Sequence, residues 1–251
     1  MKKENRINQY QKNYLASYGF EEQMVKYRRK LLLERLIAIK PKTVVEIGCG
    51  SELLYQHYFE QKGKIDQWII VEPGNVFFDI AKKSELPNLI PILGFFEDCI
   101  SEIKMNLKCK PDMIIMSSLL HEVVKPKDLL SAAKSIMGAK TILHINVPNI
   151  TSFHRQLAKS MGLINDISLL SSRNIDLKQY RVYSIESLKI EAESMSLIPI
   201  LQGGYFLKPF THQQMQLIFS KLDESMLDGL YLMGKDYPNL ASEIYIEVRK
   251  V

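Results

Sequence analysis

The segment from Val44 to Ser51 constrains the fold more than any other part of this 251-residue chain. It begins with apolar residues typical of a buried strand and ends in a turn that contains Gly48 and Gly50. Glycine adopts backbone conformations that other residues avoid and has no Cβ, so a ligand can approach the chain closely at such a turn. Glu46 adds a carboxyl group at the end of the strand. We therefore expect a nucleoside-bearing cofactor to bind where this strand ends.

Short apolar segments that alternate with helical stretches continue along the chain. The predicted strands are Thr43–Ile47, Gln67–Val71, Leu89–Leu93, Met113–Met116, Thr141–Val147, Leu197–Gln202 and Glu243–Arg249. This alternation indicates an α/β fold whose mostly parallel sheet is covered on both faces. The last segment alternates apolar and polar residues and can run antiparallel to its neighbours.

The predicted sheet is preceded by helices and interrupted by one long insertion. Residues 7–40 read as helical, because leucines recur at helical spacing up to Pro41, which stops the helix. We expect residues 1–40 to form a helical lid and residues 41–251 to form one domain. Residues 150–184 are too long and polar for a simple crossover and are predicted to be a cap over the site.

Composition narrows the function classes. Hydrophobic residues make up 46% and charged residues 24%, and there is no apolar run of about 18 residues that would span a membrane. The basic N-terminus lacks the apolar core of a secretory signal, so we expect a cytoplasmic protein. Cys49, Cys99 and Cys109 form no C-x-x-C pair, which argues for free thiols and against a metal site.

The charge distribution gives little support for nucleic-acid binding. The formal charge of +5 is modest, and basic residues cluster only at positions 26–30. We interpret this cluster as one solvated helix face in preference to a nucleic-acid patch.

The glycine turn resembles motif I of the class I S-adenosylmethionine (SAM) methyltransferases, D/E-x-G-x-G-x-G. Glu46, Gly48, Cys49 and Gly50 match it, whereas Glu52 stands where the third glycine is usual. The resemblance implies a seven-stranded Rossmann-like fold, these residues at the SAM site and S-adenosylhomocysteine (SAH) as product. A dinucleotide site needs G-x-G-x-x-G, but Leu53 holds its last position, and nearby carboxylates would repel a phosphate.

Two later segments match the expected contacts of the cofactor. Glu72, followed by Pro73, comes after the second strand, where a carboxylate can accept both ribose hydroxyls. After the third strand, methyltransferases of this class commonly hold the adenine between an apolar and an acidic side chain. The candidates are Phe95 or Phe96 for stacking and Glu97 or Asp98 for the exocyclic amine. The same residues can equally be core aromatics and a helix N-cap.

The segment after the fourth strand is similar to that of small-molecule methyltransferases. Ser117 and Ser118 are expected at the cofactor, and His121 can act as a general base or orient the acceptor. The N/D-P-P-Y/F signature of enzymes that methylate nucleic-acid bases is missing here, which disfavours such a substrate.

The second half resembles methyltransferases for bacterial surface polysaccharides, through Asn146-Val147-Pro148-Asn149 and Ser152-Phe153-His154-Arg155. That resemblance implies a sugar or an O-methyl phosphoramidate precursor of a capsule as acceptor, phosphorylated or nucleotide-linked. It makes His154 a second catalytic candidate. The residues expected at the acceptor are Asn149, His154, Arg155 and Arg181, with Arg173 and Lys208 as helpers.

The sequence thus predicts a SAM-dependent methyltransferase for a small polar metabolite, and a homo-oligomer is compatible with it. By analogy with related enzymes, a tyrosine or arginine of the lid can reach the methionine carboxylate of SAM, and a packed amphipathic helix explains these residues equally well. The candidates are Tyr10, Tyr14, Tyr18, Tyr27, Arg28 and Arg29. Two alternatives stay open: an inactive SAM-binding partner of another subunit, supported by Glu52, and an NAD-dependent oxidoreductase.

Overall fold

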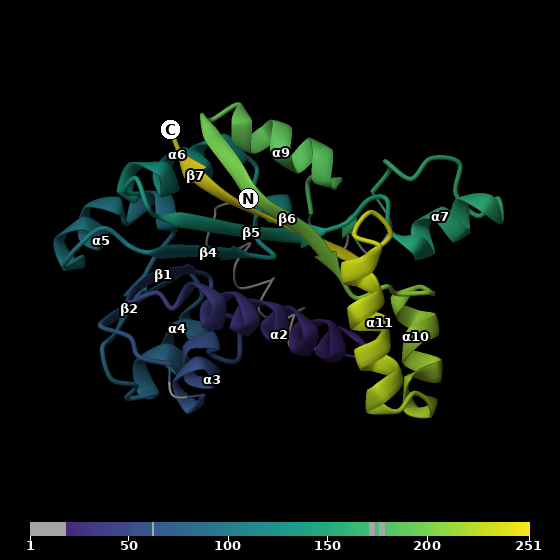
Figure 1. Cartoon of the computed structure of the whole chain (residues 1–251), viewed down its shortest axis with the longest axis horizontal. Coiled ribbons are helices and arrows are strands. Elements are labelled where there is room, and N and C mark those ends of the chain that lie inside the picture. Colours follow the sequence, from purple (N-terminus) through teal and green to yellow (C-terminus); the bar gives the residue numbers. More distant parts are fainter. Residues whose placement is uncertain (1–18, 62, 171–173, 176–178) are drawn as a thin grey trace.

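A seven-stranded sheet with the order β3-β2-β1-β4-β5-β7-β6 forms the centre of the computed structural model (Figure 1). The structure describes residues 19–251 except 62, 171–173 and 176–178. β1 to β5 pair in parallel, and β7 is antiparallel to both β5 and β6. The strands are β1 (Thr43–Ile47), β2 (Gln67–Glu72), β3 (Leu89–Leu93), β4 (Met113–Ser117), β5 (Ile142–Pro148), β6 (Leu197–Tyr205) and β7 (Glu243–Lys250). The predicted α/β sheet is confirmed, including the antiparallel last strand.

β6 extends three residues beyond its predicted end at Gln202. Gly203 and Gly204 are typical of a turn, but here they pair with Tyr245 and Ile244 of β7. A Cβ on Gly203 would lie 2.7 Å from the ring of Tyr245. The glycine therefore makes room for an aromatic ring on the neighbouring strand, a tertiary effect that the local sequence does not reveal.

Helix ends follow local signals. Pro126 begins α6, and Ser184 caps α9 by accepting from the backbone N–H of Ser187. α2 ends at Lys40, whose left-handed backbone precedes Pro41. The helices are α2 (Glu21–Ile39), α3 (Leu54–Glu60), α4 (Asn75–Lys83), α5 (Ile100–Asn106), α6 (Pro126–Ile136), α7 (Phe153–Ser160), α9 (Ile185–Glu193), α10 (His212–Ile218) and α11 (Glu224–Asp236), with short 3-10 helices η1 (Phe96–Asp98), η2 (Leu120–Glu122) and η3 (Phe219–Lys221). Of the predicted N-terminal helix, residues 7–18 lie outside the described residues.

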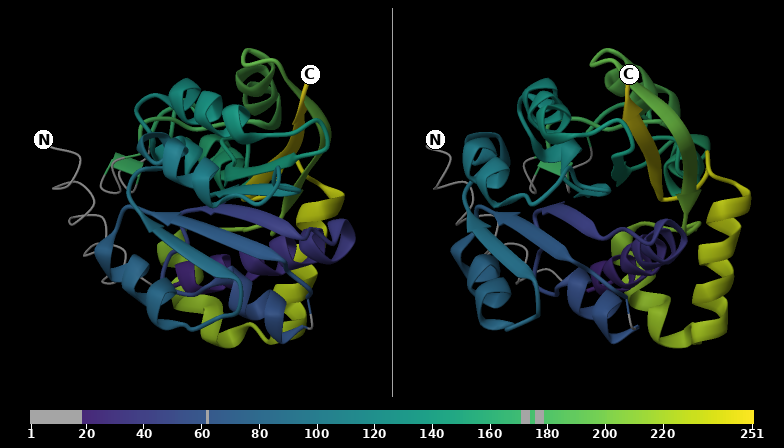
Figure 2. Two further views of the ribbon diagram at one scale, coloured as in Figure 1. Left: turned by 90° about the vertical axis from the view of Figure 1, so that its left-hand side faces the viewer. Right: turned by 60° about the vertical axis from the view of Figure 1, so that its left-hand side comes forward.

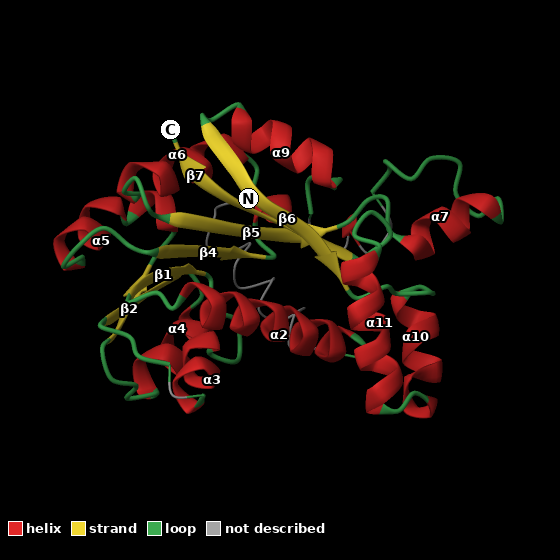
Figure 3. Ribbon diagram, viewed as in Figure 1, coloured by secondary structure: helices red, strands yellow, loops and turns green. Residues whose placement is uncertain are grey.

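The helices cover both faces of the sheet (Figures 2 and 3). Side chains of a strand alternate between its faces, so Val45 packs with α5, α6 and α9, whereas Val44 packs with α2, α3 and α4. At one end of α2, a third apolar cluster joins this helix to α10 and α11. None of the described helices is both long and apolar enough to cross a lipid bilayer.

The basic residues at positions 26–30 of α2 bind carboxylates from other parts of the chain. Lys26 and Lys30 are solvated as expected, whereas Arg28 and Arg29 are mostly buried. Every basic residue between positions 26 and 30 has an acidic partner far away in the sequence. The pairs are Lys26 with Glu224, Arg28 with Glu243, Arg29 with Glu52 and Lys30 with Asp228. These ion pairs use the charges that a nucleic-acid patch would need.

A further arginine of α2 holds a buried carboxylate of β7. Glu247 is 1% exposed and accepts from Nε and Nη2 of Arg35 at 2.8 and 2.9 Å. The Nδ1 of His144 lies 3.2 Å from the same carboxylate. Burial by itself would raise the pKa of Glu247, but the hydrogen bonds with His144 and Arg35 outweigh it and lower the pKa to about 2.

We predict that Arg35→Met lowers the free energy of unfolding by about 3 kcal/mol, because it leaves a buried carboxylate without its cation. Lys26→Met, which breaks the exposed pair with Glu224, should cost less than about 1 kcal/mol. Urea unfolding at neutral pH measures both. Equal effects of the two substitutions would contradict a structural role for the buried pair.

Candidate active site

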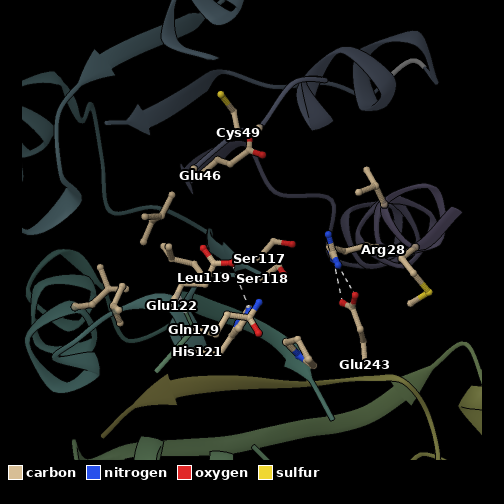
Figure 4. Close-up of a pocket in the computed structure, with 18 of the residues that line it drawn as sticks. Arg28, Glu46, Cys49, Ser117, Ser118, Leu119, His121, Glu122, Gln179 and Glu243 are labelled. Atoms are coloured by element: carbon tan, nitrogen blue, oxygen red, sulfur yellow. Dashed lines mark hydrogen bonds and ion pairs between the residues drawn. The ribbon is translucent and has the colours of Figure 1, made fainter. Parts of the chain in front are cut away.

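A cavity of about 750 Å³ opens at the carboxyl ends of β1, β2 and β4 (Figure 4). Residues of α2 and described residues of the 150–184 segment also line it. In α/β sheets of this topology, ligands bind at this edge, beside the strand where the order reverses. The volume lies in the range of roughly 300–1,000 Å³ that is usual for small-molecule sites. All predicted cofactor residues line it: Glu46, Gly48, Cys49, Gly50, Glu72, Pro73, Phe95, Phe96, Glu97, Asp98, Ser117 and Ser118.

The glycine turn has the backbone shape that its sequence predicts. Gly48 and Gly50 have φ values of +78° and +65°, in the left-handed region that favours glycine. A Cβ on Gly48 would point toward Glu72 and would lie 3.9 Å from its Oε2 atom. Between them Cys49 is buried, and burial followed by the charge of Glu72 raises the pKa of its thiol. The turn thus forms an open cradle beside a carboxylate, and its protonated thiol is no nucleophile.

Glu72 is fixed by the backbone around it. Its Oε2 accepts from the N–H of Cys49 at 3.1 Å, and its Oε1 accepts from that of Gly74 at 2.8 Å. Burial raises the pKa of Glu72, although these backbone N–H groups act in the opposite direction. The carboxylate is therefore held at the wall of the cavity beside the glycine turn, as a ligand for the hydroxyls of a ribose requires. These residues fit a SAM molecule whose sugar lies against Glu72.

Glu46 is as deeply buried as Glu72. It is 5% exposed, and its Oε2 accepts from the indole N–H of Trp68 at 2.9 Å. Burial raises its pKa to about 7, although the bond from Trp68 and the charge of Arg29 act against this. Glu46 consequently changes its charge near neutral pH.

The adenine candidates differ in burial. Phe96 is 2% exposed and belongs to the core under the sheet, whereas Phe95 is only half-buried. Phe95 is thus the more exposed of the two rings that line the cavity. Glu97 and Asp98 are both exposed at η1 and both line the cavity, so their geometry does not separate them.

The end of β4 and the segment after it bring Ser117, Ser118 and His121 to the cavity (Figure 4). His121 is 2% exposed, and its Nε2 lies 3.6 Å from Oε1 of Glu122. Its Nδ1 is buried without a hydrogen-bond partner among the described residues. Burial, and then the charge of Arg28, lower its pKa to about 3. The imidazole is therefore neutral at physiological pH.

The predicted acceptor residues are placed unequally. His154 lines the cavity, and its pKa is lowered to about 2 by burial, followed by Lys208, Arg155 and His212. Arg155 also lines the cavity, but its guanidinium donates to the carbonyls of Ile167 and Leu169 within the cap.

Asn149 and Arg181 have structural partners. Asn149 lines the cavity. Its amide donates to the carbonyls of Asn239 and Ala241 and accepts from Thr151, so it also holds the turn together. Arg181 donates to the carbonyl of Val124 at 2.9 Å and is not among the residues that line the cavity. Arg173 lies outside the described residues.

One wall of the cavity contains an ion pair that was not predicted. Arg28 donates to the carboxylate of Glu243, which also accepts from the hydroxyl of Tyr205 and from Asn146 (Figure 4). A signal was present: Ile244, Ile246 and Val248 point to one face of β7, so Glu243 and Glu247 must share the other face. Two buried carboxylates on one strand require cations nearby.

We predict that Glu46→Gln stabilises the ligand-free protein more at pH 8 than at pH 5. The folded pKa of about 7 exceeds the ordinary 4.5, so the stability that wild-type Glu46 contributes at low pH is lost as the pH rises through 7. The difference in unfolding free energy between variant and wild type should change by roughly 2 kcal/mol over this range. Urea unfolding at both pH values measures it, and Glu60→Gln on exposed α3 should show no such change. A pH-independent difference would contradict the raised pKa.

Comparison with known proteins agrees with this geometry. A family model described as a methyltransferase domain matches residues 20–194. No curated protein matches the sequence. A SAM-dependent methyltransferase from Anabaena variabilis has a TM-score of 0.61 at 13% identity, over 100% of this chain and 96% of that one.

Two other solved structures contain SAH. The plantazolicin methyltransferase BamL, in complex with a triazolic desmethylPZN analogue and SAH, has a TM-score of 0.57 at 16% identity, over 98% of this chain and 96% of that one. The 1,6-didemethyltoxoflavin-N1-methyltransferase of Burkholderia thailandensis, with bound 1,6-didemethyltoxoflavin and SAH, has a TM-score of 0.56 at 10% identity. The match covers 97% of this chain and 88% of that one. At these identities the structures show a shared fold, and none supports the resemblance to polysaccharide enzymes. The family match decides against an NAD-dependent oxidoreductase: the chain belongs to the methyltransferase-domain family and is a class I SAM-dependent methyltransferase.

Proposed function

We propose that this enzyme methylates a small polar metabolite at the end of the cavity that lies away from the glycine turn. The observation that carries the proposal is the division of the cavity walls. Glu46 and Cys49 lie on one side of the cavity, and His121 and Glu243 lie on the other (Figure 4). Glu72 belongs to the first side because it accepts from Cys49. Lys208 belongs to the second, because contacts through His212, Glu21 and Arg28 connect it to Glu243. A cavity of about 750 Å³ with such walls suits a cofactor and a small acceptor together.

The roles at the cofactor follow from the contacts. Glu72 would accept the ribose hydroxyls, and Gly48 would let the cofactor approach the backbone. Phe95 would stack on the adenine, with Glu97 or Asp98 accepting from its amine. Glu46, next to the turn, would lie below the methionine part. The lid formed by α2 and the cap of residues 150–184 would exclude water during transfer.

Bound SAM supplies an electrophilic methyl group, so the protein's own task is alignment of the acceptor. A general base works best when its pKa is near the working pH, and the pKa values of His121 and His154 are far below it. Their neutral imidazoles would instead position the acceptor through hydrogen bonds at Nδ1. An acceptor atom that already has an available lone pair at neutral pH suits this arrangement.

Within this class, we extend the proposal to a sugar or phosphoramidate precursor of a surface polysaccharide, phosphorylated or nucleotide-linked. It is supported by the resemblance around the turn that ends at Asn149 and by the cavity position of His154, close after that turn. Asn149 would act by shaping this turn, and Arg155 by holding the cap.

Turnover with a panel of acceptors tests this function. We expect SAH formation with phosphorylated or nucleotide-linked sugars or with phosphoramidates, and a methylated product by mass spectrometry. Glu72→Gln should weaken SAH binding in calorimetry about tenfold, because one charged acceptor of the ribose is lost. Glu102→Gln on exposed α5 is the matched control. Methylation of apolar acceptors alone would contradict the proposed substrate class.

The pH dependence tests the role of His121. His121→Asn should lower kcat/KM about tenfold by removing one positioning hydrogen bond. Because the pKa of His121 is about 3, both proteins should show parallel rate profiles from pH 6 to 8. An inflection near pH 6.5 that disappears in the variant would identify a base instead.

A further inference from the structure

A chain of charged side chains crosses the end of the cavity that lies away from the glycine turn. The Nζ of Lys208 lies 2.9 Å from Nδ1 of His212, and an ammonium can only donate, so this nitrogen accepts. The proton of His212 is then on Nε2, which lies 2.9 Å from Oε2 of Glu21 in a close contact without hydrogen-bond geometry among the described residues. The other oxygen of Glu21 lies 3.4 Å from Nη2 of Arg28, which also binds Glu243. Residues from α2, α10 and β7 and from the segment after β6 thus fix one another.

The position of Lys208 is consequently defined. It is 6% exposed although it is a lysine, and it lines the cavity. A free lysine side chain loses considerable rotational entropy when it binds a ligand, whereas one held by neighbours has lost it already. The bond to His212 therefore prepares the ammonium group for binding.

The surroundings of His154 show the sign of the local potential. All the charged groups that lower its pKa are cationic or can become so: Lys208, Arg155 and His212. Its Nδ1 is buried and has no hydrogen-bond partner in the described part of the chain. Among the described residues that line the cavity, the carboxylates of Glu21 and Glu243 are engaged by Arg28. This end of the cavity therefore favours a negatively charged group that can also bond to an imidazole.

We propose that the acceptor carries an oxyanion, a carboxylate or a phosphate, that binds to Lys208 and His154. Lys208 is the specificity-determining residue, and His212 and Glu21 are positioning residues. The inference rests on the proposed function, since it concerns the acceptor of the same methyl transfer. Lys208 and His212 lie beyond residue 194, where the match to the methyltransferase-domain family ends.

Binding of inorganic phosphate and of acetate to the SAH-saturated protein tests this inference. Calorimetry at constant ionic strength should detect one of these anions in wild-type protein. Lys208→Met should weaken that binding tenfold or more, Lys208→Arg should keep it within about threefold, and SAH affinity should stay within about twofold in both. Lys104→Met, the same change on exposed α5, is the matched control. Circular dichroism checks that each variant is folded.

The outcomes separate the two proposals. Anion binding that depends on Lys208 supports the inference, and the anion that binds better tells phosphate from carboxylate. Equal anion binding by wild type and Lys208→Met, or none by wild type, overturns it while leaving SAH binding intact. Failure of wild-type protein to bind SAH would instead remove the proposed function, and the oxyanion inference with it.

Discussion

Two ion pairs between α2 and β7 determine where the walls of the site lie. Arg28 and Arg35 bind Glu243 and Glu247, and both carboxylates are almost fully buried. Seven residues of a helix rise about 10.5 Å, and four residues of a strand span about 13 Å. The distance from Arg28 to Arg35 along α2 is therefore close to that from Glu243 to Glu247 along β7, and the long arginine side chains make up the difference. Because an unpaired buried carboxylate is costly, α2 has little freedom to shift across the sheet.

The same helix is tied to the cofactor end by Arg29. Its guanidinium binds the side chain and the carbonyl oxygen of Glu52, which stands where motif I usually has its third glycine. This departure from the motif was the only support for an inactive binding partner. In the structure, Glu52 joins the turn to the helix above it, and the family match identifies an enzyme. One helix therefore connects the glycine turn with the opposite end of the cavity.

Local patterns predicted the sheet and the cofactor residues, since each strand and its following turn are adjacent in the sequence. Glu72 and the glycine turn were found in this way. The choice between Phe95 and Phe96 could not be made, because it depends on which ring the core covers. The pair of Arg28 and Glu243 joins residues 215 positions apart, and no local periodicity reports such a contact. The wall that we propose for the acceptor stayed largely hidden for the same reason. Asn149 lines the cavity as well as binding backbone carbonyls, whereas Arg181 binds the carbonyl of Val124 and is not among the residues that line the cavity.

The order of these walls along the chain has a practical consequence. The cofactor residues precede position 119, whereas Lys208, His212 and Glu243 come from the last fifth of the sequence. Exchange of the C-terminal segment between related enzymes should therefore redirect the chemistry to new molecules without rebuilding the donor site. Glu21 and Arg28 on α2, which complete the chain of contacts with that segment, would have to be adapted along with it, as would His121 and His154 at the proposed acceptor site.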